Sequence, residues 1–528
     1  MLLELPNQKE PLTLNGPQLF VDWRNIDQGE VKWKLNGKNV SQWGSAKDPS
    51  PYPNTAFGIH LEAVQAKIVG PFLPQEEAWE QGYLMYVNNI MLEDGKYRLW
   101  YTVVPDDFRY RNDMNYNYDV GWLLCYAESD DGYKWTKPKL GIYSYEGQDT
   151  NCVYGREINR NFFSSGCIFR DDNPDCPPKE RYKLIYRGEE QHDDIDSWKA
   201  RQIERFGGDC DPKALKGKPG KVGTCAVTSG AVSPDGIHWT QIDDPIMMYC
   251  SDQMNVCFYD TKLKRYIGYF RMLRAGRRSV GRSETDDFRK WPTPYPCLEV
   301  TLSDHPSDDI MHCPVMKYPG CDELYVMLAT MFHRNTDNRD MRLAVSADSL
   351  YWNWLPGKNT ATRDEGGEWV YDDLEVGYNI IPMANDMMAI PVAVYKYPYK
   401  YPRCLTEGDA TPPLGEAAYA MFKKDRLCCV SAPDEGEFST RCFKLTGDRI
   451  SINFDTYGHA GYVAAELRDK KNKPIAGYGF DDSKRLSGDE IACELSWNGS
   501  SSLAALAGQD VVVRFRMHLA KIYAFEMK

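Results

Sequence analysis

The sequence predicts an all-β protein, a five-bladed β-propeller followed by a C-terminal β-sandwich. Three observations favour this fold. A short hairpin motif recurs between Ser129 and Trp352. Its copies lie roughly 50 residues apart, or about twice that, and roughly 50 residues are what one four-stranded propeller blade occupies. Aromatic residues reach 13% of the chain, and aromatic side chains pack well on pleated strands.

The motif reads Ser-x-Asp-Gly-x-x-Trp. It spans Ser129–Trp135 and Ser233–Trp239, returns at Ser346–Trp352 with Ser in the Gly place, and has a longer copy at Ser283–Trp291. The Asp accepts hydrogen bonds from backbone N–H groups that follow it, and Gly takes the positive φ of a tight turn. The Trp can fold back and bury a large apolar ring. Each copy therefore predicts a hairpin with a fixed tip.

The segments before each motif predict the blades. The four Trp residues that end the copies are separated by 104, 52 and 61 residues, so the first interval holds two units. That interval also contains a charged insertion from Gly188 to about Gly223. The predicted blades are Tyr83–Trp135, Gly166–Trp239, Met254–Trp291, Cys313–Trp352 and Tyr378–Phe422.

Three parts of the chain are expected. Residues 1–70 are irregular and predict an N-terminal arm that packs on the propeller and can supply a strand that closes the ring. Residues 71–425 form the propeller, which is expected to be catalytic. Residues 426–528 contain short alternating strands with turn signals every 8 to 12 residues or so, which is typical of a β-sandwich.

Composition excludes several classes of function. The net charge is −13 and there is no basic run, which argues against nucleic acid and anionic membranes as partners. No apolar run reaches the roughly 18 residues of a transmembrane helix, and no signal peptide is visible. We therefore expect a cytoplasmic protein, although a trimmed secreted or periplasmic chain would start in the same way. A homo-oligomer stays an open alternative.

The cysteines do not predict a metal site. The chain has 16 of them, many within apolar strand patterns, and buried free thiols in a reducing compartment explain them most simply. No Cys-x-x-Cys pair and no His-x-x-x-His pair has the spacing of a zinc site. No cofactor is expected either.

Carboxylates near the predicted channel carry the chemistry. The first strand of each blade lines the channel of a propeller, so residues near its start surround one mouth. Crowded carboxylates raise one another's pKa, which suits a proton donor beside an ionised partner and so suits glycosidic cleavage. The alternative for each is a solvent-facing loop residue. The predicted catalytic residues are Asp252, Asp309, Asp373 and Asp172.

Other side chains are expected to bind the substrate. Arg271 and Arg278 end and follow a predicted strand and could clamp a carboxylate or an anionic group of the substrate. His312 and His333 are candidate ligands of sugar hydroxyls or else structural histidines. Glu80 precedes the first blade, and Trp100 would either stack on a sugar ring or pack between blades.

The residues also resemble a known group of proteins. The Asp-Gly hairpins, the Phe169–Pro174 turn and the C-terminal strands are similar to bacterial relatives of the five-bladed-propeller glycoside hydrolases, around the fructan hydrolases, invertases, arabinanases and xylosidases. The resemblance covers roughly residues 80 to 528. Arg170–Pro174 is similar to the Arg-Asp-Pro motif of the fructan enzymes, which implies that Asp171 or Asp172 stabilises the transition state. The Asp-hairpins also look like the structural Asp-boxes of sialidases.

This sequence departs from that family at two motifs. The Trp-x-Asn-Asp-Pro-Asn-Gly motif that holds the nucleophile is absent, and so is the Glu-Cys motif that holds the acid; Asp252 stands nearest to the latter. The resemblance therefore implies a glycoside hydrolase without assigning its nucleophile. Two alternatives remain, a glycoside phosphorylase whose arginines hold phosphate, and a non-catalytic carbohydrate-binding propeller.

Overall fold

The structure is a computed structural model. It describes residues 10–27, 33–35, 38–40, 56–81, 83–105, 122–159, 163–216, 224–252, 255–357, 360–361, 371–396, 398–399 and 415–528. The chain forms two compact units. One contains Ala66–Trp354 and Asn359–Met421, and the other contains Met1–Gln65, Leu355–Lys358 and Phe422–Lys528.

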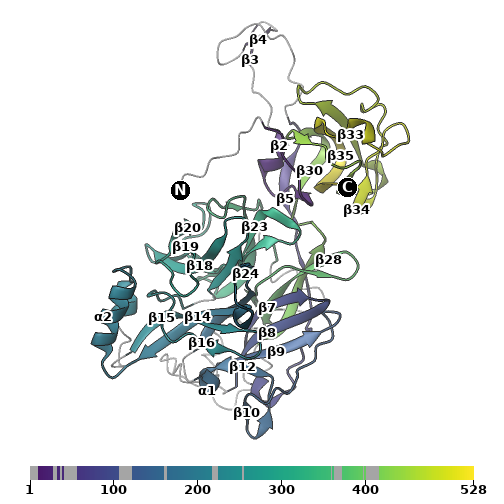
Figure 1. The fold of residues 1–528 in the computed structure, drawn as a ribbon. Helices are drawn as coiled ribbons and strands as arrows, with labels where there is room; N and C mark the ends of the chain where they lie inside the picture. The colour runs from purple at the N-terminus through teal and green to yellow at the C-terminus, as the bar shows by residue number, and fades with distance from the viewer. Residues whose placement is uncertain are drawn as a thin grey trace. The chain divides into compact units, whose positions relative to one another are not determined.

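The larger unit contains five antiparallel sheets in sequence order, one for each predicted blade, which confirms the propeller (Figure 1). From the inner to the outer strand, the first blade is β7 (Tyr83–Glu93), β8 (Lys96–Val104), β9 (Leu123–Ser129) and β12 (Cys152–Gly155). The second is β13 (Ser164–Arg170), β14 (Tyr182–Gln191), β15 (Thr224–Ser233) and β16 (Thr240–Gln241). The third is β17 (Val256–Asp260), β18 (Arg265–Arg274), β19 (Arg277–Thr285) and β20 (Tyr295–Leu298).

The last two blades follow the same plan. The fourth is β21 (Asp308–His312) with β22 (Val315–Tyr318), then β23 (Cys321–His333), β24 (Asn338–Ser346) and β25 (Asn353–Trp354). The fifth is β26 (Asp373–Val376) with β27 (Ile381–Met383), then β28 (Met387–Tyr395), β29 (Glu416–Lys423) and β6 (Lys67–Val69). The outermost strand of the fifth blade therefore comes from the N-terminal side of the chain.

The hairpins are built as the motif predicts. In the second copy, Asp235 Oδ1 accepts from the N–H groups of Ile237 at 2.9 Å and His238 at 2.8 Å. The first and third copies repeat these two bonds. Gly236 has φ +79°, and Ser349, in the Gly place, also takes a positive φ of 64°. The final Trp residues of these three copies are only half-buried, whereas Trp291 of the longer copy is fully buried.

Smaller elements lie between the strands. The charged insertion carries two helices, α2 (Ile195–Arg205), whose N-terminus is capped by Asp194, and α3 (Pro212–Lys216). The helix α1 (Arg156–Asn159) follows the first blade, and β10 (Ser144–Tyr145) pairs with β11 (Gln148–Asp149). No helix in the described ranges is long and apolar enough to cross a membrane.

The second unit is a nine-stranded antiparallel sheet around its own apolar core. Its central strand is β35 (Asp510–Met527), in which Leu519 has a positive φ of 44°. Before Leu519 the strand pairs with β33 (Tyr462–Asp469), and after Leu519 it pairs with β32 (Ile450–Thr456). The other strands that join this sheet are β30 (Cys428–Thr440), β31 (Phe443–Lys444), β34 (Asp489–Glu494), β1 (Gln18–Leu19), β2 (Ile26–Asp27) and β5 (His60–Ala63).

The N-terminal segment differs from the sequence-based expectation. The sequence predicts residues 1–70 as an arm on the propeller, but β1 pairs with β35, and β2 and β5 pair with β30. Among the described residues of this segment, β1, β2 and β5 therefore complete the C-terminal sheet, and β6 extends a propeller blade. A separate hairpin joins β3 (Trp33–Leu35) and β4 (Lys38–Val40).

Candidate active site

The inner strands of four blades and the second strand of the third blade bring polar residues to a common centre. Tyr86 of β7 lies with its ring 5.5 Å from that of His312 in β21, and it accepts from Ser165 of β13 at 3.4 Å. His312 Nδ1 contacts Glu375 of β26. Arg271, in β18 of the third blade, is one of the charges that, after burial, lower the pKa of His312. We call these residues, together with Arg278, Asp309, Arg339 and Asp373, the central cluster.

Arg339 holds two carboxylates in this cluster. Its Nε donates to Asp373 Oδ1 at 2.9 Å, and its Nη1 donates to Glu375. Asp373 and Glu375 are two residues apart in β26, so their side chains leave the same face of the strand, about 6.5 Å apart at Cα. All three side chains are buried. Burial raises the pKa of Asp373 despite the opposing effect of Arg339.

His312 is a neutral imidazole at the centre of this network. Its side chain is fully buried, and burial, followed by the charges of Arg339, Arg271 and Arg278, lowers its pKa well below the usual value. A charged imidazole would have to lose its hydration and face three cations, and these effects outweigh the neighbouring Glu375 carboxylate. His312 can therefore accept or donate a hydrogen bond but does not add a charge.

Asp309 is fixed by two arginines. Its carboxylate accepts from Arg278 Nη1 at 2.8 Å and from Arg334 Nε at 2.6 Å, and the backbone N–H of Arg278 donates at 2.9 Å. Burial alone would raise the pKa of Asp309, but these bonds outweigh it and hold the pKa below its usual value. Asp309 therefore stays ionised and positions the two guanidinium groups.

Asp252 lies at the accessible side of the cluster. Its side chain is 47% exposed and contacts Arg271 Nη2. Arg271 and Arg278 face the same side of their blade, because Arg271 lies opposite Val280 and Arg278 opposite Leu273 in the β18–β19 pair. Burial, followed by the charge of Arg278, lowers the pKa of Arg271 to about 10. Its Nη1 is buried without a hydrogen-bond partner among the described residues.

His333 lies beside the start of β21. It pairs across the sheet with Asp308, and its ring nitrogens contact Asp308 at 2.8 Å and Asp340 at 3.0 Å. The hydrogen bond to Asp340 is the largest cause that raises the pKa of His333, to about 9. His333 is therefore a charged imidazole in an ion-pair network.

Asp172 is not brought to the central cluster. It follows Arg170, the last residue of β13, whereas Ser165 stands near the start of that strand. Its electrostatic neighbours include Glu93, the last residue of β7, and it is 59% exposed. Since the inner strands run in the same direction, as the parallel bridge between Asn89 and Tyr378 indicates, Asp172 lies at the opposite end.

Two predicted binding residues have structural partners instead. Glu80 is fully buried, accepts from Tyr101 Oη at 2.6 Å and pairs with Lys137 at 2.7 Å. Trp100 is fully buried between the first two blades and donates from Nε1 to Gly236 O at 2.8 Å. For Trp100 the structure thus favours packing between blades over sugar stacking.

Sequence reasoning missed several members of the cluster. Arg339 lies in the third strand of the fourth blade, 34 residues before its partner Asp373. Arg334 lies in the loop before that strand, 25 residues after its partner Asp309. Tyr86 and Ser165 belong to no recognisable sequence motif. Glu375 could have been found, because it repeats the position of Asp373 with the two-residue period of a strand.

The cluster offers hydrogen-bond donors and paired acids but no metal site. Within the described ranges, no group of three or more His, Cys, Asp or Glu residues could hold a metal ion. The pKa of Asp373 is raised and that of Asp309 is lowered. A pair of this kind is suited to proton donation by one acid beside the fixed negative charge of the other. The arginines can bind oxygen atoms of a ligand.

No protein-family model matches this chain, and no curated protein matches it in sequence. Solved structures do match. A protein solved as a complex with RGII is 12% identical, over 68% of this chain and 92% of that protein, with a TM-score of 0.40. A thermostable family-43 glycoside hydrolase is 12% identical, over 68% of this chain and 97% of that enzyme, with a TM-score of 0.38. The exo-inulinase from Aspergillus awamori is 11% identical, over 87% of this chain and 99% of that enzyme, with a TM-score of 0.39. Glycoside hydrolases are thus among the solved structures that this chain resembles, and the similarity is one of fold.

Proposed function

We propose that the protein is a glycoside hydrolase that acts on an oligosaccharide at the central cluster. The observation that carries this proposal is the pair of carboxyl groups on one face of β26, Asp373 and Glu375, held by a single guanidinium. Because one guanidinium contacts both carboxylates, the two groups lie close together, as the paired acids of glycosidases do.

The roles follow from the environments of the acids. Asp373, whose pKa burial raises, would donate a proton to the leaving oxygen. Glu375, beside His312, would act as the base or the nucleophile. Asp309 stays ionised and orients Arg278, and Asp252 orients Arg271, so both acids position cations instead of reacting.

A second candidate is a propeller that binds a carbohydrate without cleaving it. One observation favours it: Asp252, Asp309, Asp373 and Glu375 each contact an arginine or a histidine. A carboxylate that keeps such a partner throughout does not react. A phosphorylase is the third candidate, because Arg271 and Arg278 share a face and could hold phosphate.

The three candidates differ in a simple assay. Wild type and Glu375→Gln are incubated with a panel of oligosaccharides, with and without inorganic phosphate, and reducing ends and sugar phosphates are measured. The hydrolase predicts phosphate-independent release that Glu375→Gln loses by at least about 100-fold. Release that requires phosphate would indicate the phosphorylase, and binding without any release would indicate the non-catalytic propeller.

We also propose that the protein works in a reducing compartment. Every cysteine in the described part of the chain is free. Cys125 and Cys152 have their sulfur atoms 3.4 Å apart in the buried core of the first blade and are not bonded. Titration of thiols in the unfolded protein, freshly purified without reductant, should find no disulfide.

A further inference from the structure

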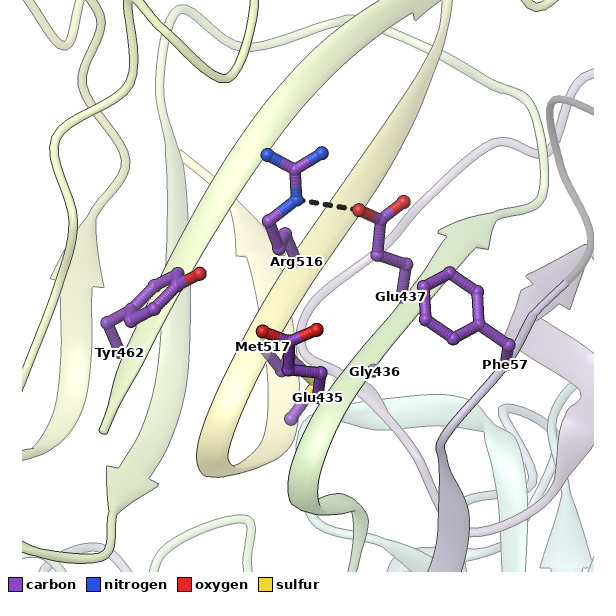
Figure 2. A pocket seen from close by; sticks show the side chains of 7 residues that line it. All are labelled: Phe57, Glu435, Gly436, Glu437, Tyr462, Arg516 and Met517. Atoms are coloured by element: carbon purple, nitrogen blue, oxygen red, sulfur yellow. Dashed lines mark hydrogen bonds and ion pairs between the residues drawn. The ribbon is translucent and has the colours of Figure 1, made fainter. Parts of the chain in front are cut away.

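A depression lies on the sheet of the C-terminal unit. It has a volume of about 320 Å³, at the lower end of small-molecule sites. Its lining residues are Phe57, Glu435, Gly436, Glu437, Tyr462, Arg516 and Met517 (Figure 2). No residue of the central cluster belongs to it, and the proposal below does not depend on the hydrolase activity.

The strand register places the polar and aromatic side chains on one face. Phe57 pairs with Glu437, and Glu437 pairs with Arg516. In the next row of the same face, Glu435 lies opposite His518, and His518 lies opposite Tyr462. Residues directly opposite one another, or two apart along a strand, share a face of the sheet.

Two aromatic rings stand at opposite sides of this face. Figure 2 shows Phe57 on one side and Tyr462 on the other, with Glu435 and Arg516 between them. Phe57 and Tyr462 belong to segments separated by three strand spacings, which is about 14 Å. Phe57 is 52% exposed, although two backbone hydrogen bonds to Glu437, each 3.0 Å long, fix its position. An exposed ring on a rigid backbone is suited to stack on a ligand.

Two glycines allow close backbone packing at and beside the depression. A Cβ at Gly58 would lie 1.9 Å from Glu435 O, and a Cβ at Gly436 would lie 2.8 Å from the side chain of Ile59. The register of β30 also shifts between Ala432 and Glu435, which is a bulge. Bulges occur next to binding sites because they redirect a side chain. Here the bulge precedes Glu435, which is exposed.

The charged groups supply both donors and acceptors. Arg516 donates from Nε to Glu437 at 2.6 Å, and its guanidinium lies 4.0 Å from the ring centroid of Phe480. Glu437 also pairs with Arg514 at 2.7 Å, so its charge is compensated. Glu435 is exposed on the same face and remains as an acceptor. Sugar hydroxyls both donate and accept, and they match this set without requiring a net charge.

We propose that this face binds a neutral oligosaccharide, with Phe57 and Tyr462 stacking on two of its sugar rings and with Glu435 and Arg516 bonding hydroxyls between them. The occupant is an oligosaccharide and not a single sugar, because the segments that carry the two rings are three strand spacings, about 14 Å, apart. We expect the site to retain a polymer without processing it.

Affinity electrophoresis tests the proposal with the full chain. Native gels contain xylan, arabinan, inulin or soluble starch, each at graded concentrations. At least one polymer should retard the wild type. The Phe57→Ala/Tyr462→Ala double variant should bind that polymer about 30-fold or more weakly, as expected for the loss of two anchoring rings. Tyr351→Ala, a matched control at a 76% exposed tyrosine in the propeller, should run as the wild type.

A second variant separates loss of binding from loss of folding. Glu435→Ala changes an exposed side chain, so the thermal melt should be unchanged while retardation falls several-fold. Turnover of short soluble substrates should be unaffected in all three variants. The proposal is wrong if no polymer retards the wild type, or if both the double variant and Glu435→Ala are retarded as strongly as Tyr351→Ala.

Discussion

His333 is the most informative histidine for pH dependence. Its contacts with Asp340 and Asp308 raise its pKa to about 9 from an unfolded value of 6.5. The stabilisation is therefore complete below about pH 6.5 and is lost as the pH rises through about 9. Between pH 6 and 10 the wild type should lose on the order of 1 to 2 kcal/mol of unfolding free energy from this site, allowing for its partial exposure.

Urea denaturation across that pH range measures the effect. His333→Gln should be less stable than the wild type at pH 6, and the difference should shrink at pH 10. A difference that stays constant with pH would show that the charge of His333 contributes nothing.

Arg339 is expected to hold the fifth blade against the fourth. Removing it leaves Asp373 and Glu375 buried without their shared cation, and a buried ion pair that loses one partner costs about 3 to 5 kcal/mol. Arg339→Met should therefore lower the unfolding free energy by that amount. Arg274→Met, at a 58% exposed arginine paired with Glu299, is the control and should cost less than about 1 kcal/mol. An equal loss of unfolding free energy in the two variants would show that Arg339 does not hold the two blades together.

Single residues of the cluster were only partly predictable. That Asp252, Asp309 and Asp373 lie near one another was predictable because they precede or start inner strands, which is a local signal. Their arginine partners were not found, because Arg334 and Arg339 reach them only through the pairing of strands within and between blades. Asp172 lies two residues after the end of β13, whereas the other three predicted acids precede or start their strands, so the structure does not bring it to the cluster.

The hairpin is the element that the sequence predicted best. Its hydrogen bonds join residues two or three positions apart, so the local pattern contains almost all of its structure. The tips of the hairpins also pack between blades: the indole of Trp100 donates to Gly236 O. The expectation that each final Trp is a buried anchor held only for Trp291.

Asp235 gives a direct test of this element. It accepts two backbone bonds and a third from Ser233 at 3.0 Å. Asp235→Ala should lower the unfolding free energy by about 2 kcal/mol, since hydrogen bonds to charged groups are the stronger ones. Asp243→Ala, at an exposed aspartate shortly after the hairpin, should be nearly neutral. Denaturant titrations that rank the two variants the other way would contradict the role of the motif.

The ring of blades depends on a strand from the N-terminal side. β6 pairs with β29 through Ile68 and Ala420, and Ile68 is 3% exposed whereas the adjacent Val69 is 37% exposed. Ile68→Ala should cost about 2 to 4 kcal/mol through lost burial and the cavity that remains. Val69→Ala should cost less than about 1 kcal/mol. Thermal melts of the two variants should differ clearly; overlapping melts would mean that β6 does not secure the fifth blade.

The overall plan was predictable where it repeats. Five units of similar length predict five blades, but no repeat marks residues 1–65, so their pairing with β30 and β35 could not be anticipated. The charged insertion was recognised as an insertion, yet its helix α2 was missed, because charge obscured the helical pattern. Long-range strand pairing of this kind depends on tertiary contacts that local patterns do not record.

The most direct test of the central claim compares the two ends of the inner strands. Rates of reducing-sugar release from a substrate of the wild type are measured for Asp373→Asn and Asp172→Asn, with both folds verified by their melts. We expect Asp373→Asn to lose at least about 100-fold in kcat, because it can no longer donate a proton, and Asp172→Asn to retain wild-type rates. Full activity in Asp373→Asn with loss in Asp172→Asn would place the chemistry at the other end of the propeller and contradict the account.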